Sequence, residues 1–192
     1  MEHYFSPTPH TAHKPKRIGC SFFDRSFVFL TDASVFSRRK VDFGTRLLIE
    51  YSEVKKGDRL LDLGCGYGVV GIVLSFFCRN VIMVDINHRA CELAQRNIKE
   101  NKIKNAQVVC GSLGDVSGKF NVILFNPPLR AGKKVYLPLI EEAYSFLFEG
   151  GRIYVVARTT QGAKSLFDFM GSLYKTEYVT KKAGYRVIGG AV

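Results

Sequence analysis

The fold is decided by the stretch Leu60-Leu61-Asp62-Leu63-Gly64-Cys65-Gly66-Tyr67-Gly68-Val69-Val70-Gly71. It passes from an apolar run through an acid to a glycine-rich loop, and then to apolar residues at helical spacing. This order predicts a buried strand, a tight loop and the first turn of a helix. Glycines allow positive φ and close approach of a ligand, and the N–H groups that start a helix point toward that ligand. The stretch therefore predicts a ligand-binding loop.

A second buried strand, Val81-Ile82-Met83-Val84-Asp85, follows about twenty residues later and ends in a carboxylate. In α/β folds an acid at this place accepts hydrogen bonds from ribose hydroxyls. The two stretches together predict a nucleoside cofactor. A β–α turn without any ligand is the alternative. The glycines at 64, 66, 68 and 71, together with Asp62 and Asp85, weigh against it.

Two kinds of nucleoside cofactor compete for the loop. Gly66-x-Gly68-x-x-Gly71 matches the dinucleotide-binding pattern G-x-G-x-x-G. Read from Gly64 the pattern fails, because Val69 stands where its third glycine belongs, and Asp62 is not part of that fingerprint. The arrangement Asp-x-Gly-x-Gly-x-Gly at 62–68 resembles motif I of class I S-adenosylmethionine-dependent methyltransferases. The resemblance implies that the loop packs against the methionine and ribose parts of that cofactor.

Composition bounds the class of protein. The 192 residues are 46% hydrophobic with a mean hydropathy near zero, which predicts one soluble globular domain. No apolar run approaches the roughly 20 residues of a membrane span. The N-terminal residues 1–17 are polar and lack the apolar core of a signal peptide.

The cysteines at 20, 65, 78, 91 and 110 form no C-x-x-C pair, which argues against a disulfide framework and against structural zinc. Reduced thiols predict a cytoplasmic protein. His10-x-x-His13 is the single metal-like pair, and a solvated arm explains it better than a metal site does. We therefore expect no metal.

The formal net charge is +11, from 28 basic and 17 acidic residues. A basic balance of this size fits a polyanionic partner, and nucleic acid is the obvious one, although excess lysine and arginine can also serve solubility.

Apolar strands and amphipathic helices alternate after an N-terminal extension. We expect a flexible basic arm at 1–17 and one domain over 18–192, made of a β-hairpin at 18–31 and a core at 32–192. Asp42 and Asn87 are predicted helix N-caps. The predicted strands are 59–63, 80–85, 106–110, 122–125, 153–157, 175–181 and 185–190, and the predicted helices are one after Asp42 and those at about 69–78, 88–100, 133–148 and 161–173. The pattern predicts an α/β, Rossmann-like fold whose mostly parallel seven-stranded sheet has helices on both faces.

Ligands of such sheets bind beyond the carboxyl ends of the strands, which selects residues 62–68, 85–87, 111–113, 126–130 and 158–160. The strand 122–125 runs into Asn126-Pro127-Pro128-Leu129. A plain turn is one reading of this sequence. However, two prolines also fix the backbone, and the residue before a proline is held extended, which aims the Asn126 side chain.

Methylation of an exocyclic amine needs this kind of fixed group. The lone pair of such an amine is delocalised into the ring, so the nitrogen attacks poorly. Acceptors for both N–H groups hold the amine so that the lone pair can point at a methyl donor. The Asn126 side-chain oxygen and the Pro127 carbonyl are predicted to be those acceptors, and Pro128 removes a competing N–H donor. Catalysis would then consist mostly of proximity and orientation.

The motifs in order, 62–68, Asp85 and Asn126-Pro127-Pro128, resemble the N-methyltransferases of class I. Further pieces resemble the small-methyltransferase-domain family, over about residues 33–190. These pieces are Val35-Phe36-Ser37, Val41-Asp42-x-Gly44-Thr45, Arg130-Ala131-Gly132-Lys133 and Gly184-Tyr185-Arg186-Val187. Bacterial members of that family methylate guanine N2 in small-subunit ribosomal RNA, and the chain is similar to the short, archaeal-type members that have a single catalytic domain.

The resemblance implies an S-adenosylmethionine-dependent N-methyltransferase that releases S-adenosylhomocysteine and acts on guanine N2, in small-subunit ribosomal RNA. The implied catalytic residues are Asn126, Pro127, Pro128 and Leu129. The implied cofactor-binding residues are Asp62, Gly64, Cys65, Gly66, Gly68, Asp85, Ile86, Ser112, Leu113 and Asn126.

Two positions depart from the family's pattern. Ser112 stands where the family has an aspartate that reaches the adenine amine, so adenine has a hydroxyl acceptor instead. Leu129 stands where many members have an aromatic residue that stacks on the target base, an interaction of roughly 1–3 kcal/mol. Phe36 is the candidate to replace that ring, and a core position is the alternative for it.

A set of basic residues flanks the predicted pocket and is proposed to bind RNA phosphates; for each residue alone, ordinary solvated charge is the simpler explanation. The set is Arg38, Arg39, Lys40, Arg130, Lys133 and Lys134. A paired guanine would have to flip out to reach Asn126. The alternatives left open are methylation of a protein glutamine amide, methylation of tRNA guanine N2, a cofactor- and RNA-binding module without turnover, and an NAD-dependent enzyme.

Overall fold

The computed structural model describes residues 13–33 and 35–192. Its strands are β1 Lys16–Phe22, β2 Arg25–Thr31, β3 Arg59–Leu63, β4 Asn80–Asp85, β5 Ala106–Cys110, β6 Phe120–Phe125, β7 Leu147–Arg158, β8 Lys175–Lys182 and β9 Tyr185–Ala191. Its α-helices are α1 Phe43–Tyr51, α2 Val69–Leu74, α3 His88–Glu100, α4 Lys133–Ser145 and α5 Ala163–Gly171. Short 3-10 turns lie at Leu113–Asp115, Leu129–Ala131 and Thr159–Gln161.

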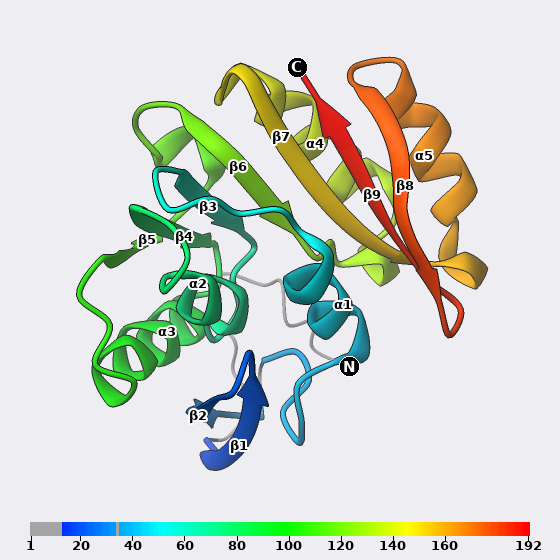
Figure 1. The fold of residues 1–192 in the computed structure, drawn as a ribbon. Coiled ribbons are helices and arrows are strands. Elements are labelled where there is room, and N and C mark those ends of the chain that lie inside the picture. Colours follow the sequence, from blue (N-terminus) through cyan, green and yellow to red (C-terminus); the bar gives the residue numbers. More distant parts are fainter. Residues whose placement is uncertain (1–12, 34) are drawn as a thin grey trace.

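The main sheet has seven strands in the order β5-β4-β3-β6-β7-β9-β8 (Figure 1). The pairs from β5 to β7 are parallel, and β9 runs antiparallel to both of its neighbours. The predicted mostly parallel Rossmann-like sheet is therefore confirmed. Because the order turns at β3, the loops after β3 and β6 leave the same edge of the sheet side by side, which is where such folds bind ligands.

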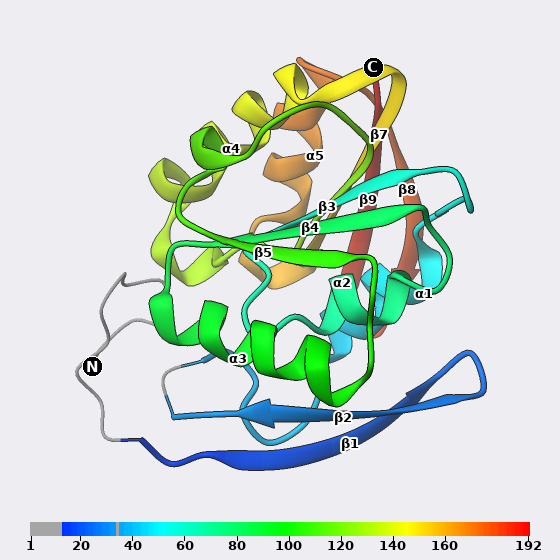
Figure 2. The same cartoon turned by 90° about the vertical axis from the view of Figure 1, so that its left-hand side faces the viewer.

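Helices cover both faces of the sheet (Figure 2). α4 and α5 lie on one face, and α1, α2 and α3 lie on the other, with the β1–β2 hairpin outside them. The hairpin is attached to α3 by Asn97, which accepts from the Leu30 N–H at 2.7 Å and donates to the Leu30 carbonyl at 3.0 Å. Asn101 makes the same pair of bonds to Val28. The hairpin starts at Lys16, so Lys16 and Arg17 belong to it and not to the predicted arm, of which residues 1–12 lie outside the described part.

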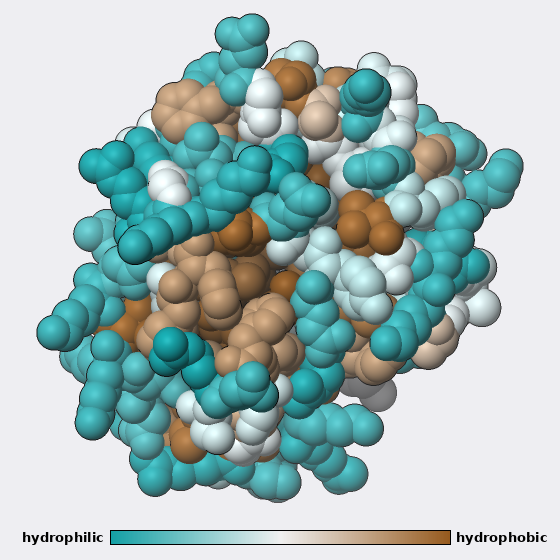
Figure 3. Space-filling view, viewed as in Figure 1, coloured by the Kyte–Doolittle hydropathy of each residue, from teal (hydrophilic) through white to brown (hydrophobic). Residues whose placement is uncertain are grey.

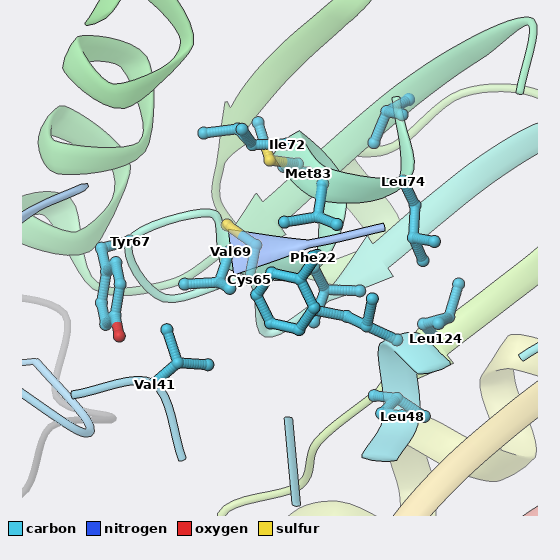
Figure 4. Packing of buried hydrophobic residues seen from close by; sticks show 14 of the residues in the cluster. Phe22, Val41, Leu48, Cys65, Tyr67, Val69, Ile72, Leu74, Met83 and Leu124 are labelled. Atoms are coloured by element: carbon cyan, nitrogen blue, oxygen red, sulfur yellow. The ribbon is translucent and has the colours of Figure 1, made fainter. Parts of the chain in front are cut away.

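Alternation along the buried strands divides the core into two clusters. Leu60 faces the cluster under α1, α2, α3 and the hairpin, while Leu61 faces the cluster under α4 and α5. Phe22 of the hairpin, Leu48 of α1 and Leu124 of β6 meet in the first cluster, which Figure 4 shows from close by. Burial of these side chains fixes the hairpin as part of the domain.

The predicted N-caps are confirmed, since Asp42 accepts from the Gly44 and Thr45 N–H groups and Asn87 accepts from those of Arg89 and Ala90. α2 is shorter than predicted. Asn105, from the loop before β5, donates to the carbonyls of Ser75, Cys78 and Arg79, which holds that segment out of the helix.

α4 also ends earlier than predicted, at Ser145, because Leu147 already starts β7 and Gly150-Gly151 lie within that strand.

In the view of Figure 3, hydrophobic surface gathers in a hollow near α2 and the hairpin and is framed by hydrophilic surface. Phe23 and Phe76 are among the exposed hydrophobic side chains, and the Phe23 ring lies 4.9 Å from that of Phe77.

Two further observations concern the described part of the chain. All five cysteines are free, and no cluster of three or more His, Cys, Asp or Glu side chains there could hold a metal ion. None of its helices combines the length and the apolar character that crossing a membrane requires.

Candidate active site

A cavity of about 630 Å³ opens at the carboxyl edge of the sheet, where the loops after β3, β4, β5, β6 and β7 converge. This volume suits a nucleoside-sized ligand. The predicted site residues that line it are Asp62, Gly64, Cys65, Gly66, Asp85, Ile86, Ser112, Leu113, Asn126, Pro127, Pro128 and Leu129. The structure thus brings together two motifs that lie about 60 residues apart in the sequence.

Two carboxylates hold the glycine-rich loop. Asp62, at the end of β3, is 2% exposed and accepts from the Gly71 N–H at 2.9 Å. Asp85, at the end of β4, accepts from the Gly66 N–H at 2.8 Å and from the Asn87 N–H at 2.9 Å. Each Asp85 oxygen has a second lone pair, so the carboxylate can still accept from the hydroxyls of a ribose.

Burial sets the charge of these acids. It raises the pKa of the Asp62 carboxyl to about 7; the Gly71 hydrogen bond opposes the shift and the Asp85 charge adds to it. Burial also raises the pKa of Asp85, against the hydrogen bonds that it accepts. A buried carboxylate, Asp62, and a half-buried one, Asp85, beside a cavity favour a ligand that carries positive charge.

Gly68, at the end of the loop, and Gly71, in α2, have packing roles. Gly68 does not line the cavity; with φ 90° it precedes α2, and a Cβ there would lie 3.3 Å from Ala94 of α3. A Cβ on Gly71 would lie 2.5 Å from the Met83 sulfur. Gly71 therefore allows α2 to lie against β4, which accounts for the dinucleotide-like spacing without a pyrophosphate.

Ser112 has an acidic neighbour that the sequence analysis missed. Asp115 accepts from the Ser112 N–H and from its hydroxyl, both at 2.8 Å, and these bonds lower the pKa of Asp115. The Ser112 hydroxyl proton is therefore directed at Asp115, and its oxygen lone pairs remain available to an amine donor. A carboxylate thus stands beside the position where the family's aspartate is absent.

Asn126 is fixed by a residue of α1, which lies 81 positions earlier in the chain. Its Nδ2 donates to the Thr45 hydroxyl at 2.9 Å, which leaves Oδ1 as an acceptor at the cavity. Thr45 is a buried residue in the first turn of α1. The Pro127 carbonyl accepts from the Leu129 N–H at 2.8 Å across Pro128, whose φ of −73° and ψ of 69° form an inverse γ-turn. One lone pair of that carbonyl remains for a second N–H.

The mouth of the cavity is only partly as predicted. Phe36 lines the cavity and is 40% exposed, so it lies at the surface and not in the core. Of the predicted basic set only Arg130 lines the cavity. Arg38, Arg39 and Lys40 do not line it, although they directly follow Phe36 and Ser37, which are lining residues. Lys133 donates to Ser165 of α5, and Lys134 is exposed outside the lining.

Comparison with known proteins agrees with this geometry. The family model "Methyltransferase small domain" matches residues 26–189. The chain belongs to this family. It is a methyltransferase that uses S-adenosylmethionine as its methyl donor, and the acidic, glycine-walled cavity fits that cationic cofactor.

Three proteins of known sequence or structure are similar to this chain. The uncharacterized protein YbxB of Bacillus subtilis (strain 168) is 37% identical, over 97% of this chain and 96% of its own length. The ribosomal RNA small subunit methyltransferase C of Haemophilus influenzae (strain 86-028NP) is 35% identical, over 64% of this chain and 39% of its own. A solved structure of the T. thermophilus 16S rRNA N2 G1207 methyltransferase, in complex with AdoMet and guanosine, superimposes with a TM-score of 0.84 at 22% identity, over 95% of this chain and 52% of its own. The chain therefore spans about half, or less than half, of the length of these two rRNA methyltransferases.

The structure adds four residues to the site that the sequence analysis left without a role there. Thr45, Asp115, Arg158 and Tyr185 lie at or beside the cavity. Thr45 and Tyr185 belong to sequence motifs that resemble the family, and Arg158 starts the segment 158–160, which was predicted to lie at the carboxyl edge of the sheet. The sequence therefore indicated where these residues lie but not which residues they contact. The contact between Thr45 and Asn126 joins residues 81 positions apart, which no local pattern signals.

The first prediction concerns this contact. Thr45→Val keeps the shape of the side chain and removes the oxygen that fixes the Asn126 amide. We expect kcat to fall roughly 10- to 100-fold through loss of orientation, with little change in cofactor affinity. Thr45→Ser keeps the hydroxyl and should stay within a few-fold of the parent enzyme. Equal losses in both variants, in a methyl-transfer assay, would show that the hydroxyl does not matter.

The second prediction concerns pH. Below its pKa of about 7 the Asp62 carboxyl is neutral, and above it the carboxylate favours the cationic sulfonium of S-adenosylmethionine. Affinity for S-adenosylmethionine should therefore rise several-fold between about pH 6 and about pH 8, measured by calorimetry. S-adenosylhomocysteine lacks the sulfonium charge, and Asp62→Asn lacks the titrating group, so both should show a smaller change. An equal pH dependence for the two ligands would contradict the assignment.

Proposed function

We propose that the chain is a cytoplasmic RNA methyltransferase that transfers a methyl group to the exocyclic N2 amine of guanine in small-subunit ribosomal RNA. The observation that carries the proposal is the fixed acceptor Asn126 Oδ1, which opens onto the same cavity as Asp62 and Asp85. A planar NH₂ group is the nucleophile that such an acceptor would orient.

Different site residues are assigned to different parts of the cofactor and to the acceptor amine. We assign Asp85 to the ribose hydroxyls, the 64–66 loop to the methionine part and the Ser112 oxygen to the adenine amine. S-adenosylmethionine supplies an electrophilic methyl group on its sulfonium. Asn126 Oδ1 and the Pro127 carbonyl hold the two N–H groups of the acceptor amine, so that its lone pair is free to attack. The nitrogen becomes acidic as it is methylated, and its proton can pass to solvent, so the site needs no strong base.

Three observations support RNA as the partner. The net charge of +11 favours a polyanion. Phe36 and Arg130 stand at the mouth of the cavity, where a flipped base and its phosphates would enter. A relative is named a ribosomal RNA methyltransferase, and a structural neighbour is described with guanosine bound.

Methyl transfer to separated acceptors tests the proposal. Cofactor labelled in its methyl group would be incubated with the enzyme and, in parallel, with naked rRNA, tRNA, small ribosomal subunits and ribosomal protein. We expect label in rRNA or in the small subunit. Label confined to tRNA would overturn the ribosomal assignment. Label confined to protein would favour the glutamine amide, and cofactor binding without transfer to any acceptor would indicate a binding module.

A further inference from the structure

Two motifs from opposite ends of the chain meet beside the catalytic asparagine. Asp42 and Thr45 belong to the start of α1, and Tyr185 is the first residue of β9, where it pairs with Arg158 at the end of β7. A Cβ on Gly44 would lie 2.8 Å from the Tyr185 ring, so glycine there allows α1 to rest against that ring.

Side-chain groups and the Thr45 backbone N–H form one continuous chain of polar contacts. Asn126 Nδ2 donates to Thr45 Oγ1 at 2.9 Å, and the Thr45 N–H donates to Asp42 Oδ2 at 3.3 Å. The Tyr185 hydroxyl donates toward Asp42 Oδ1 at 3.5 Å, and Arg158 Nε donates to the Tyr185 hydroxyl at 2.7 Å. All five residues line the cavity. They form a polar wall that runs from Asn126 to Arg158.

The groups that this wall offers to a ligand follow a definite order. Asn126 Oδ1 is an acceptor, the Asp42 carboxylate is a second acceptor, and the Nη groups of Arg158 are donors. None of the ion pairs within the described residues involves Arg158. Burial and the nearby Asp42 charge raise the pKa of Tyr185, so its phenol keeps the proton that it directs at Asp42.

The pairing edge of guanine has the complementary order: the N2 amine donates, N1–H donates and O6 accepts. We propose, on the basis of the function above, that Asp42 reads N1–H and Arg158 reads O6 while Asn126 holds the N2 amine. Tyr185 positions both reading groups, since it contacts each of them.

The same wall discriminates against other amines. Adenine and cytosine each present an unprotonated ring nitrogen next to their exocyclic amine, and its lone pair would face the Asp42 carboxylate. Juxtaposed acceptors disfavour the wrong base, in addition to the hydrogen bonds that favour the right one. A glutamine amide has neither N1–H nor O6 and would leave Asp42 and Arg158 unused.

A base analogue tests the inference. 2-Aminopurine keeps the N2 amine, lacks O6 and has a lone pair at N1. Two short uridine-rich RNAs, one with a single central guanine and one with 2-aminopurine in its place, would be compared by kcat/KM. For the parent enzyme we expect a preference for guanine of about 100-fold or more.

Three variants complete the test. Asp42→Asn keeps a good N-cap but can turn an amide donor toward N1, so the preference should fall about tenfold or more. Arg158→Met should lower it by a similar factor through loss of the O6 contact. Arg130→Met removes the same charge from the same cavity and should slow both RNAs equally. Thermal unfolding and S-adenosylhomocysteine binding would verify that each variant is folded.

The outcomes separate the two levels of the proposal. If the preference for guanine stays within about twofold of the parent value in both Asp42→Asn and Arg158→Met, the inference that the polar wall recognises guanine is wrong, and the proposed function is unaffected. The same inference is wrong if the parent enzyme binds cofactor and methylates the 2-aminopurine RNA as fast as the guanine RNA. Absence of methyl transfer to guanine in this RNA, in rRNA and in small subunits overturns the proposed function itself.

Discussion

Replacing Asn126 with alanine should lower kcat by at least about 1,000-fold, because the variant loses the acceptor that orients the amine. The Kd for S-adenosylmethionine should change by less than about threefold, since Asp62, Asp85 and the glycine loop remain. Single-turnover methyl transfer and calorimetry on the same preparation measure the two effects separately.

Asn80→Ala is the matched control. Asn80 starts β4 at the opposite edge of the sheet, and its Oδ1 makes no hydrogen bond within the described residues. This variant should keep parent-like turnover. If a folded Asn126→Ala protein failed to bind cofactor, Asn126 would be part of the cofactor site more than of the acceptor site, and its assigned role would be wrong.

Asp85→Ala should raise the Kd for S-adenosylmethionine about 100-fold. The variant loses charge-assisted hydrogen bonds to the ribose, each worth about 1.5–3 kcal/mol, and also the bond that holds Gly66. At saturating cofactor, kcat should fall much less than kcat/KM, because the acceptor site stays in place. Calorimetry with S-adenosylmethionine and with S-adenosylhomocysteine should give similar losses, since both carry the ribose.

Glu92→Ala removes a negative charge from the exposed side of the adjacent helix α3 and serves as the control for net charge. Its Kd should match that of the parent. An unchanged Kd in Asp85→Ala would mean that this carboxylate serves only to hold the loop, and that the ribose is held elsewhere.

The sequence predicted the parts of the fold that local chemistry decides. The strand at 59–63, the caps Asp42 and Asn87 and the full extent of α3 follow from periodicity and capping, and the structure has them there. The end of α2 was not predictable in this way. A side chain about 30 positions away, Asn105, decides it by taking the carbonyls of residues 75–79.

The candidate site shows the same division. Motif spacing placed Asp62, Asp85 and Asn126 at one edge of the sheet, and all three line the cavity. The spacing could not reveal that Thr45 fixes the Asn126 amide, or that Tyr185 joins Asp42 to Arg158, because each of these contacts joins residues far apart in the sequence. It also placed Gly68 in the cofactor site, whereas its neighbours are Ile72, Met83 and Ala94 of the core.

The central claim is that the acceptor is the N2 amine of guanine, and mass spectrometry of nucleosides tests it most directly. RNA treated with the enzyme and methyl-labelled S-adenosylmethionine would be digested to nucleosides, with Asn126→Ala as the inactive control. We predict label in N2-methylguanosine and in no other nucleoside. Label in adenosine or cytidine, or at another position of guanosine, would contradict the claim.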